Sequence, residues 1–234
     1  MVVTRFNPNV NGPLHLGHLY MALVNEAYAH DRQGAFVVRF DDTNPGAIRL
    51  SPEKNRATAN RQREDLEWME VCVDMWQFQS DLIANTQERL QVLDPLALQE
   101  EPEKFELPTF IRMVGTNWIP MYYTPLQSAT RVLMDYSIGA THIIRGEEFC
   151  VELSLYHHYC YLFELPAPKF FFLPRLQGPH GDISKTEGGY TIAGFRSAGY
   201  KPEDVRELLQ VACLIWPHNG WDLINLKREP RIRI

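Results

Sequence analysis

The first thirty residues constrain the fold more than any other part of the chain. Residues 2–6 form a short β-type run, and residues 7–14 form a polar loop with two Pro, three Asn and one Gly. His-Leu-Gly-His follows at residues 15–18, and an apolar helical pattern continues from there. A strand, a polar loop and a helix start make an anion pocket in α/β sheets, because the loop exposes N–H groups and the helix N-terminus is partly positive. This stretch therefore predicts a phosphate site.

The residues of this stretch support that hypothesis to different degrees. His15 and His18 are three residues apart, so both rings can face one phosphate chain. Gly17 between them leaves room for a flat ring against the backbone. Taken singly, each histidine is equally well explained as a surface side chain on a capped helix.

A second strand is predicted at residues 35–41, closed by Asp41-Asp42-Thr43-Asn44-Pro45. Strand, helix and strand in this order predict a parallel βαβ unit, whose ligands bind beyond the carboxyl ends of the strands. The polar string is explained equally well by a ligand site and by an Asx turn with a helix cap.

Ser51 and Pro52 then predict the start of a helix that reaches about residue 69, with a solvated charged face that includes Asp65.

The second half of the chain repeats the alternation of helices and strands. Residues 94–123 form an irregular insert with two strand-like runs, a candidate hairpin. A helix from residue 125 to a turn at 139, a buried strand at 141–146, a helix at 153–163 and a central strand at 169–174 follow. Glycines then flank a Ser-Lys pair in residues 177–189, which fits a mobile loop or an ordinary hairpin turn. A last helix is expected to reach about residue 214.

Composition narrows the class of protein. The chain has 234 residues, 45% of them hydrophobic and 12% aromatic, which is enough for a folded core. No run is long enough for a membrane span, no signal-peptide pattern opens the chain, and the net charge of −6 argues against a broadly basic nucleic-acid surface. Because the four cysteines are scattered, we expect buried free thiols in a cytoplasmic protein, with no disulfide, no zinc and no other protein-held metal.

Four blocks of the sequence together resemble one family. They are residues 5–18, residues 39–45, the Gly-Ala-Thr-His-Ile-Ile-Arg-Gly-Glu-Glu-Phe of residues 139–149, and the Asp-Ile-Ser-Lys-Thr loop of residues 182–186. The chain resembles the catalytic core of class I aminoacyl-tRNA synthetases in the form of the glutamyl and glutaminyl enzymes, over roughly residues 2–216. The resemblance implies an α/β, Rossmann-like nucleotide-binding fold with a parallel sheet. Its halves would be residues 1–93 and 124–234, with a shortened insertion at 94–123.

The resemblance implies ATP-dependent activation of an amino acid as its aminoacyl-adenylate. It assigns His15 and His18 to the phosphates, and Ser184 and Lys185 to the leaving pyrophosphate. The further ATP-binding residues that it implies are Pro8, Gly17, Glu148, Phe149 and Leu176. Mg²⁺ would arrive with ATP and be held mainly by phosphate oxygens and water.

An amino-acid pocket is implied as well, for glutamate or glutamine by default. Arg5 and Arg145 match arginines that face substrate carboxylates, and Asn9 and Asp41 match positions near the substrate backbone and amino group. The pocket assignment is completed by Asn7, Gln127 and Arg131. Gln127 and Arg131 depart from the family, which has a Tyr and a small amide there.

Two further departures leave the reaction open. Asp182 replaces the first lysine of the mobile loop, which should weaken ATP use, and nothing in the sequence matches the domains that read the anticodon arm. The acyl acceptor is the acceptor end of a tRNA, or another molecule if the chain is a tRNA-modifying or amino-acid ligase paralogue. A catalytically degenerate nucleotide-binding paralogue and a fragment of a larger synthetase are the remaining alternatives.

Overall fold

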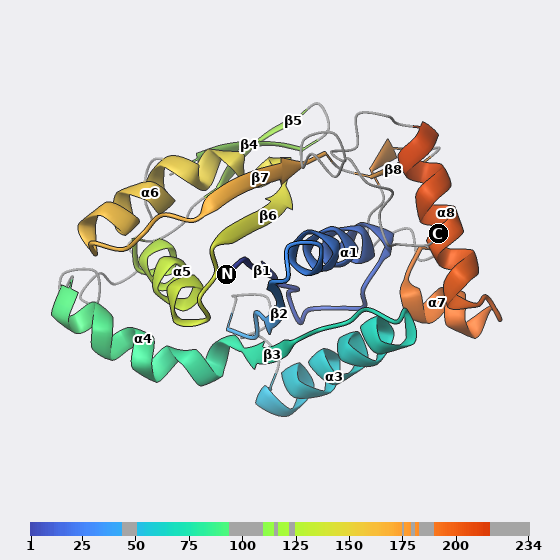
Figure 1. Cartoon of the computed structure of the whole chain (residues 1–234), viewed down its shortest axis with the longest axis horizontal. Coiled ribbons are helices and arrows are strands. Elements are labelled where there is room, and N and C mark those ends of the chain that lie inside the picture. The colour runs from blue at the N-terminus through green and yellow to red at the C-terminus, as the bar shows by residue number, and fades with distance from the viewer. Residues whose placement is uncertain are drawn as a thin grey trace.

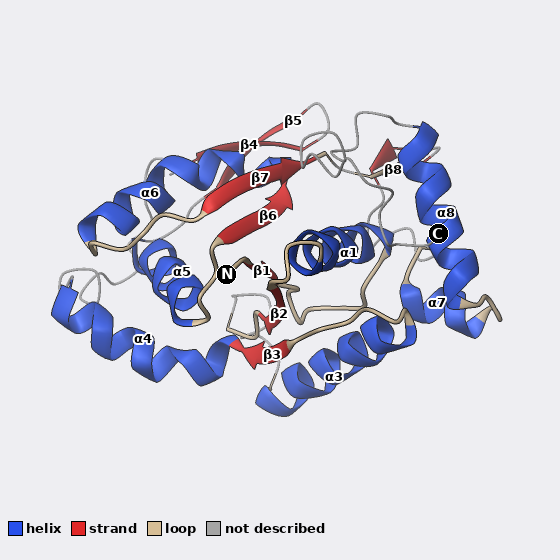
Figure 2. Cartoon of the chain, viewed as in Figure 1, coloured by secondary structure: helices blue, strands red, loops and turns tan. Residues whose placement is uncertain are grey.

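The computed structural model describes residues 1–43, 51–93, 110–114, 117–121, 125–174, 176–178, 181–182 and 190–215. A five-stranded sheet in the order β3-β2-β1-β6-β7 forms its centre, and every neighbouring pair is parallel (Figures 1 and 2). The strands are β1 (Val3–Phe6), β2 (Ala35–Phe40), β3 (Met75–Phe78), β6 (His142–Gly146) and β7 (Lys169–Leu173). The predicted parallel α/β fold is confirmed. The strand order reverses beside β1, which is where such sheets bind ligands.

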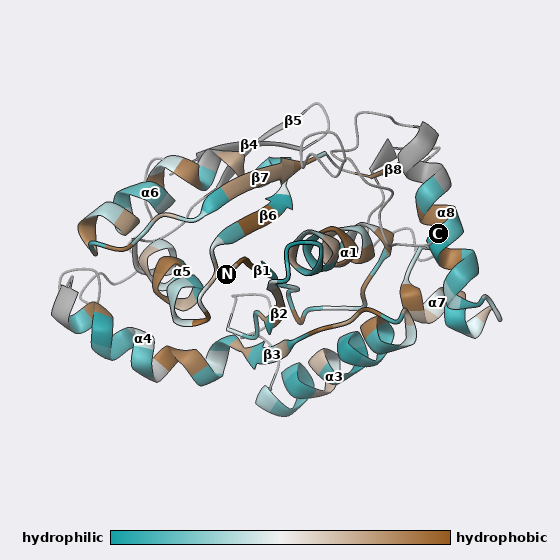
Figure 3. Ribbon diagram, in the orientation of Figure 1, coloured by the Kyte–Doolittle hydropathy of each residue, from teal (hydrophilic) through white to brown (hydrophobic). Residues whose placement is uncertain are grey.

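Helices cover both faces of this sheet (Figure 1). One face carries α1 (Leu16–His30), α3 (Pro52–Trp68), α7 (Ile192–Ser197) and α8 (Pro202–Ile215), and the other carries α4 (Gln79–Leu93), α5 (Pro125–Ser137) and α6 (Leu153–Leu162). The 3-10 helix η2 (Glu147–Glu152) joins β6 to α6. Figure 3 shows the apolar residues of β6 and β7 between these helices and the polar residues of α3 on its outer side.

The side chains of β2 show why its sequence lacks polar alternation. Phe36, Val38 and Phe40 belong to the core under α1, whereas Val37 packs on the opposite face with Val3 and Ile138. A parallel strand that is covered on both faces is apolar throughout. Its single charged residue, Arg39, belongs to the candidate site.

Several local predictions are confirmed. Ser51 caps α3 and accepts from the Lys54 N–H at 3.4 Å, with Pro52 as the first helical residue. The predicted insert contains an antiparallel hairpin of β4 (Phe110–Val114) and β5 (Asn117–Met121). A second small hairpin, β8 (Gln177–Gly178) with β9 (Gly181–Asp182), precedes residues 183–189, which lie outside the described residues.

Three predictions are wrong. β7 pairs only with β6 in the described sheet, so it is an edge strand and not a central one. Cys72 and Cys150 are exposed rather than buried, because they lie in a loop and in η2; Cys160 is buried, and all three are free. Asp65, expected on a solvated face, is only 2% exposed because α7 packs over it.

Among the described residues, no helix is long and apolar enough to cross a membrane.

Candidate active site

The start of α1 is capped by two imidazoles. His15 is the N-cap residue, and its Nδ1 accepts a hydrogen bond from the Gly17 N–H at 3.1 Å. His18 Nδ1 accepts from the His15 N–H at 3.3 Å, and the two ring centroids are 3.8 Å apart. Because both Nδ1 atoms are acceptors, the neutral rings carry their hydrogen on Nε2. Two imidazole rings therefore lie together at the partly positive start of α1, which suits an anion such as a phosphate chain.

Gly17 lies directly against the capping imidazole. A Cβ at this position would lie 3.0 Å from Cε1 and 3.1 Å from Nδ1 of His15, so the ring would have to shift by a few tenths of an ångström. The glycine therefore lets the ring lie close to the backbone of the first turn.

The polar loop between β1 and α1 is held from two sides. Gln62 of α3 donates through Nε2 to the carbonyl oxygens of Asn9 (2.9 Å) and Gly12 (2.7 Å), and it is 1% exposed. The Asp41 N–H donates to the Pro8 carbonyl at 3.0 Å, so the end of β2 fixes the loop as well. Sequence reasoning missed Gln62, because nothing local marks it among the polar residues of α3.

The segment after the Ser-Lys loop is joined to the same corner. The Leu16 N–H donates to the Tyr190 carbonyl at 3.1 Å, and the Ile192 N–H donates to the Leu14 carbonyl at 3.0 Å. His15 and Thr191 form an isolated antiparallel bridge between these bonds. The chain that leaves the loop is therefore fixed beside the cap.

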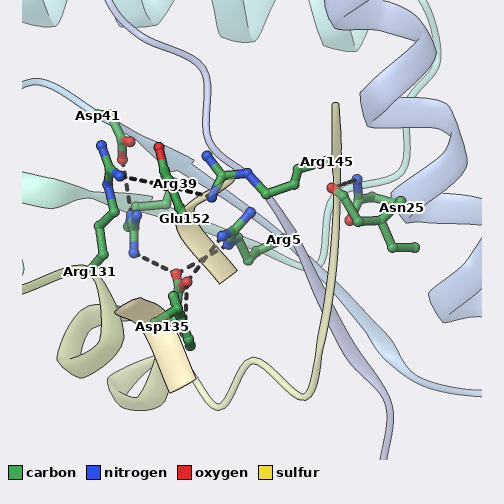
Figure 4. A network of polar contacts seen from close by, with 10 residues as sticks. Arg5, Asn25, Arg39, Asp41, Arg131, Asp135, Arg145 and Glu152 are labelled. Atoms are coloured by element: carbon green, nitrogen blue, oxygen red, sulfur yellow. Dashed lines mark hydrogen bonds and ion pairs between the residues drawn. The ribbon is translucent and has the colours of Figure 1, made fainter. Parts of the chain in front are cut away.

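A buried cluster of charges lies at the carboxyl ends of β1 and β2 (Figure 4). Arg5 donates through Nε and Nη2 to the two oxygens of Asp135 at 3.1 and 3.0 Å, and Arg39 donates to Asp135 at 2.9 Å and to Asp41 at 3.1 Å. The Tyr156 hydroxyl donates to Asp135 at 3.1 Å. Burial opposes ionisation of Asp135, but Arg5 and Arg39 outweigh it and hold its pKa at about 2.

Asn7 joins this cluster. In the amide orientation that satisfies its hydrogen bonds, its side-chain oxygen accepts from Arg39 Nη2 at 2.6 Å and its nitrogen donates to the Phe6 carbonyl at 3.2 Å. Asn9 lies next to it, and its side-chain oxygen is buried without a hydrogen-bond partner in the described part of the chain.

A second charged group lies between α5 and η2 (Figure 4). Arg131 and Arg145 both donate through Nη1 to Oε2 of Glu152, at 2.8 and 3.1 Å. The guanidinium carbon of Arg145 also lies 4.0 Å from the ring centroid of Phe149, a cation–π contact. Glu152 is 8% exposed, so the ion pairs are largely withdrawn from water.

The residues expected around adenosine lie in the segments beyond β6 and β7. Glu148 lies against the backbone of Gly146, where an added Cβ would be 2.2 Å from its Oε2. Leu176 is buried in the core below α1. Ser184 and Lys185 lie outside the described residues, and of Gln127 and Asp182 only the backbone is described, in α5 and β9.

The structure thus brings together Arg5, Asn7, Arg39, Asp41 and Asp135 in one cluster, and Arg131, Arg145, Phe149 and Glu152 in the other. Sequence reasoning assigned no role to Arg39, Asp135 or Glu152. A charged residue inside the apolar run of β2 was the available signal for Arg39, since a buried charge requires a partner. Among the described residues, no group of His, Cys, Asp or Glu could hold a metal ion.

A cavity of about 210 Å³ adjoins the charged cluster through Tyr156. Thr141 and Pro168, which precede β6 and β7, contribute to its lining, so it lies at the amino ends of these strands. Its wall includes Tyr156, whose hydroxyl reaches Asp135 from this side.

Comparison with known proteins agrees with this geometry. Residues 1–99 match the family described as tRNA synthetases class I (E and Q), catalytic domain. The chain is 25% identical to glutamate–tRNA ligase 2 of Neorickettsia sennetsu over 97% of its length, and 28% identical to glutamate–tRNA ligase 1 of Rubrobacter xylanophilus over 93%. It spans 58% and 54% of the length of these relatives.

Solved structures show the same fold. A glutamate–tRNA synthetase from Elizabethkingia anophelis superposes with a TM-score of 0.64 at 22% identity, over 92% of this chain and 62% of that one. A glutamate–tRNA ligase from Elizabethkingia meningosepticum in complex with its amino acid gives 0.62 at 20% identity, over 89% and 60%. By sequence and by fold, the chain is similar to the catalytic domain of the class I aminoacyl-tRNA synthetases for glutamate and glutamine, as its motifs predict.

Proposed function

We propose that the chain activates an amino acid with ATP, forming an aminoacyl-adenylate and pyrophosphate. The observation that carries this proposal is the pair of imidazoles that caps α1, whose Nδ1 atoms both accept from backbone N–H groups at the start of the helix. ATP fits this corner, because the partly positive helix N-terminus and the imidazoles complement its phosphates. Mg²⁺ would be carried by the phosphate oxygens and water.

In this reaction an oxygen of the amino-acid carboxylate attacks the α-phosphorus, and the bond from that phosphorus to the bridging oxygen of pyrophosphate breaks. Negative charge grows on the α-phosphate and on the leaving group, so catalysis depends on positioned donors. We assign His15 and His18 to that charge, and Ser184 and Lys185 to the pyrophosphate. Removal of one such donor typically slows a reaction by about 10²–10³-fold.

In the amino-acid pocket, we assign different parts of the substrate to the cluster around Asp135 and to the cluster around Glu152. We assign Arg131 and Arg145 to a carboxylate of the amino acid, glutamate or glutamine by default, with Gln127 beside them on α5. The side-chain oxygen of Asn9, which has no hydrogen-bond partner among the described residues, and the carboxylate of Asp41 suit the amino group. Arg5 remains assigned to this pocket, where its double hydrogen bond to Asp135 fixes its position.

We place adenosine between the segments beyond β1 and β6, which supply Pro8, Gly17, Glu148, Phe149 and Leu176. The acyl acceptor that the relatives suggest is the acceptor end of a tRNA, because they are named glutamate–tRNA ligases. A different acceptor, as in a tRNA-modifying or amino-acid ligase paralogue, stays open because the chain spans 54–58% of their length. The free cysteines support a cytoplasmic location.

ATP–pyrophosphate exchange tests the proposal. The assay is run with each of the twenty amino acids, with and without bulk tRNA. Exchange with glutamate or glutamine alone is the expected result, and a requirement for tRNA would favour tRNA as the acceptor. ATP binding without exchange would indicate the degenerate nucleotide-binding paralogue, which Asp182 in place of a lysine favours. No ATP binding would contradict the assignment of the α1 corner.

A further inference from the structure

The carboxylate of Glu152 already occupies the two arginines that the proposed function assigns to the amino acid. Arg131 and Arg145 reach the same oxygen, Oε2, at 2.8 and 3.1 Å (Figure 4). The three residues come from α5, β6 and η2, so the contact depends on the tertiary fold. Glu152 lies three residues beyond the third motif block, and the family resemblance assigns it no role.

The contacts show how the charges of the network are paired. Arg5 and Arg39 pair with Asp41 and Asp135. Arg131 and Arg145 both pair with the single carboxylate of Glu152. A ligand carboxylate therefore meets two guanidinium groups that share one fixed carboxylate, and it is repelled by that carboxylate at short range.

We propose that Glu152 is a specificity-determining residue that competes with the ligand carboxylate for Arg131 and Arg145. This inference rests on the proposed function and adds a determinant to it. Glu152 weakens the binding of an acidic amino acid, but it repels an uncharged amide far less. The residue thereby sets how strongly the pocket prefers glutamate over glutamine.

Glu152→Gln tests the inference directly, because an amide keeps an acceptor for the arginines and removes the charge. We expect the KM for glutamate in ATP–pyrophosphate exchange, and the Kd for glutamate by calorimetry, to fall about fivefold, or about 1 kcal/mol. The KM values for glutamine and ATP should change less than twofold, roughly within the error of such assays. Glu147→Gln, an exposed neutralisation in the same 3-10 helix, is the matched control and should behave as the wild type.

A double-mutant cycle keeps the test independent of any single variant. Arg131→Gln removes one of the two guanidinium groups and keeps the Glu152 carboxylate, so we expect the KM for glutamate to rise about tenfold. Adding Glu152→Gln removes the competing negative charge and should recover most of that loss. If Glu152 only orients the arginines, the double variant will bind glutamate more weakly than Arg131→Gln alone.

The outcomes separate the two proposals. If the wild type catalyses exchange but Glu152→Gln binds glutamate no more tightly than the wild type, the role of Glu152 is overturned and the proposed function stays intact. Absence of both exchange and amino-acid binding in the wild type would remove the proposed function, and this inference with it.

Discussion

One ring nitrogen of His15 and one of His18 hold the first turn of α1. The Nδ1 atoms accept from backbone N–H groups and define the first turn of α1, so the orientation of both rings is fixed before a ligand binds. Rings that are held in this way need no further ordering to meet an anion at the helix start, which is how a site is preorganised. The two explanations that the sequence left open, a capped helix and a phosphate site, are therefore compatible.

His18→Ala separates stability from catalysis. The variant loses one capping interaction, so we expect the free energy of unfolding to fall by only about 1 kcal/mol. The exchange rate should fall by about 10²–10³-fold, because a donor to the phosphates is removed. Urea denaturation and exchange assays measure the two effects, and His157→Ala, at an exposed position of α6, is the control. Normal turnover in His18→Ala would remove His18 from the catalytic site.

Individual residues also show how far the sequence could predict the site. Arg5 and Arg145 could be located because each stands inside a recognisable motif. The partners Asp135 and Glu152 could not. Asp135 is 130 residues from Arg5, and Glu152, although only seven residues from Arg145, meets it only when η2 is in place. A motif is a local sequence pattern, whereas the partner of a buried charge is determined by which residues the tertiary fold brings next to it.

Among the elements, α3 has a function that its amphipathic pattern does not reveal. Its start and end were predictable from Ser51, Pro52 and the turn after Trp68. Its inner face, however, supports the loop of the phosphate corner through Gln62 and contacts α7 through Asp65, which pairs with Arg196 at 3.3 Å. This helix therefore links the α1 corner to the segment that follows the Ser-Lys loop.

The Asp65 contact predicts a pH dependence of stability. Burial raises the pKa of Asp65 from 3.8 to about 6, although Arg196 partly counteracts this. Because the folded state binds this proton more tightly than the unfolded state, acidification from pH 7 to pH 4 should add stability through this group, by about 1–3 kcal/mol.

Asp65→Asn imitates the protonated form and supplies the measurement. We expect it to be more stable than the wild type at pH 8, by about 1–3 kcal/mol in urea denaturation, with the difference disappearing near pH 4. Arg196→Gln should move the midpoint of the wild-type pH dependence to higher pH, because it removes the charge that favours the carboxylate. If the stability difference between Asp65→Asn and the wild type is the same at pH 8 and at pH 4, the pH dependence is not due to Asp65.

At the scale of the whole molecule, Asp135 connects the two halves of the chain. It lies on α5, and it holds Arg5 of β1 and Arg39 of β2 while it accepts from Tyr156 of α6. The parallel sheet and most helix boundaries could be predicted from local patterns. The edge position of β7 could not, because the order of strands is set by crossovers and not by any single segment.

Loss of the Asp135 charge should therefore weaken the whole fold. Its pKa of about 2 lies below the usual 3.8, so this group contributes about 2–3 kcal/mol above pH 4, which is lost as the pH falls from 4 to 2. Asp135→Asn at neutral pH leaves Arg5 and Arg39 buried with too little opposing charge. We expect a cost of about 3–5 kcal/mol, measured by urea denaturation. A loss below 1 kcal/mol, roughly the worth of an exposed ion pair, would show that the cluster is not coupled to folding.

The central position of β1 also determines when the sheet can be completed during synthesis. Of the five strands of the described sheet, β1 leaves the ribosome first and can pair with β2 early. Its other neighbour is β6, and the Val3 N–H donates to the Thr141 hydroxyl across 138 residues. At about 5–20 residues per second, that edge of β1 waits roughly 7–30 s for its partner. The first of these five strands is thus among the last to be enclosed, and until β6 is made its unpaired edge is open to mispairing, against which a chaperone would protect it.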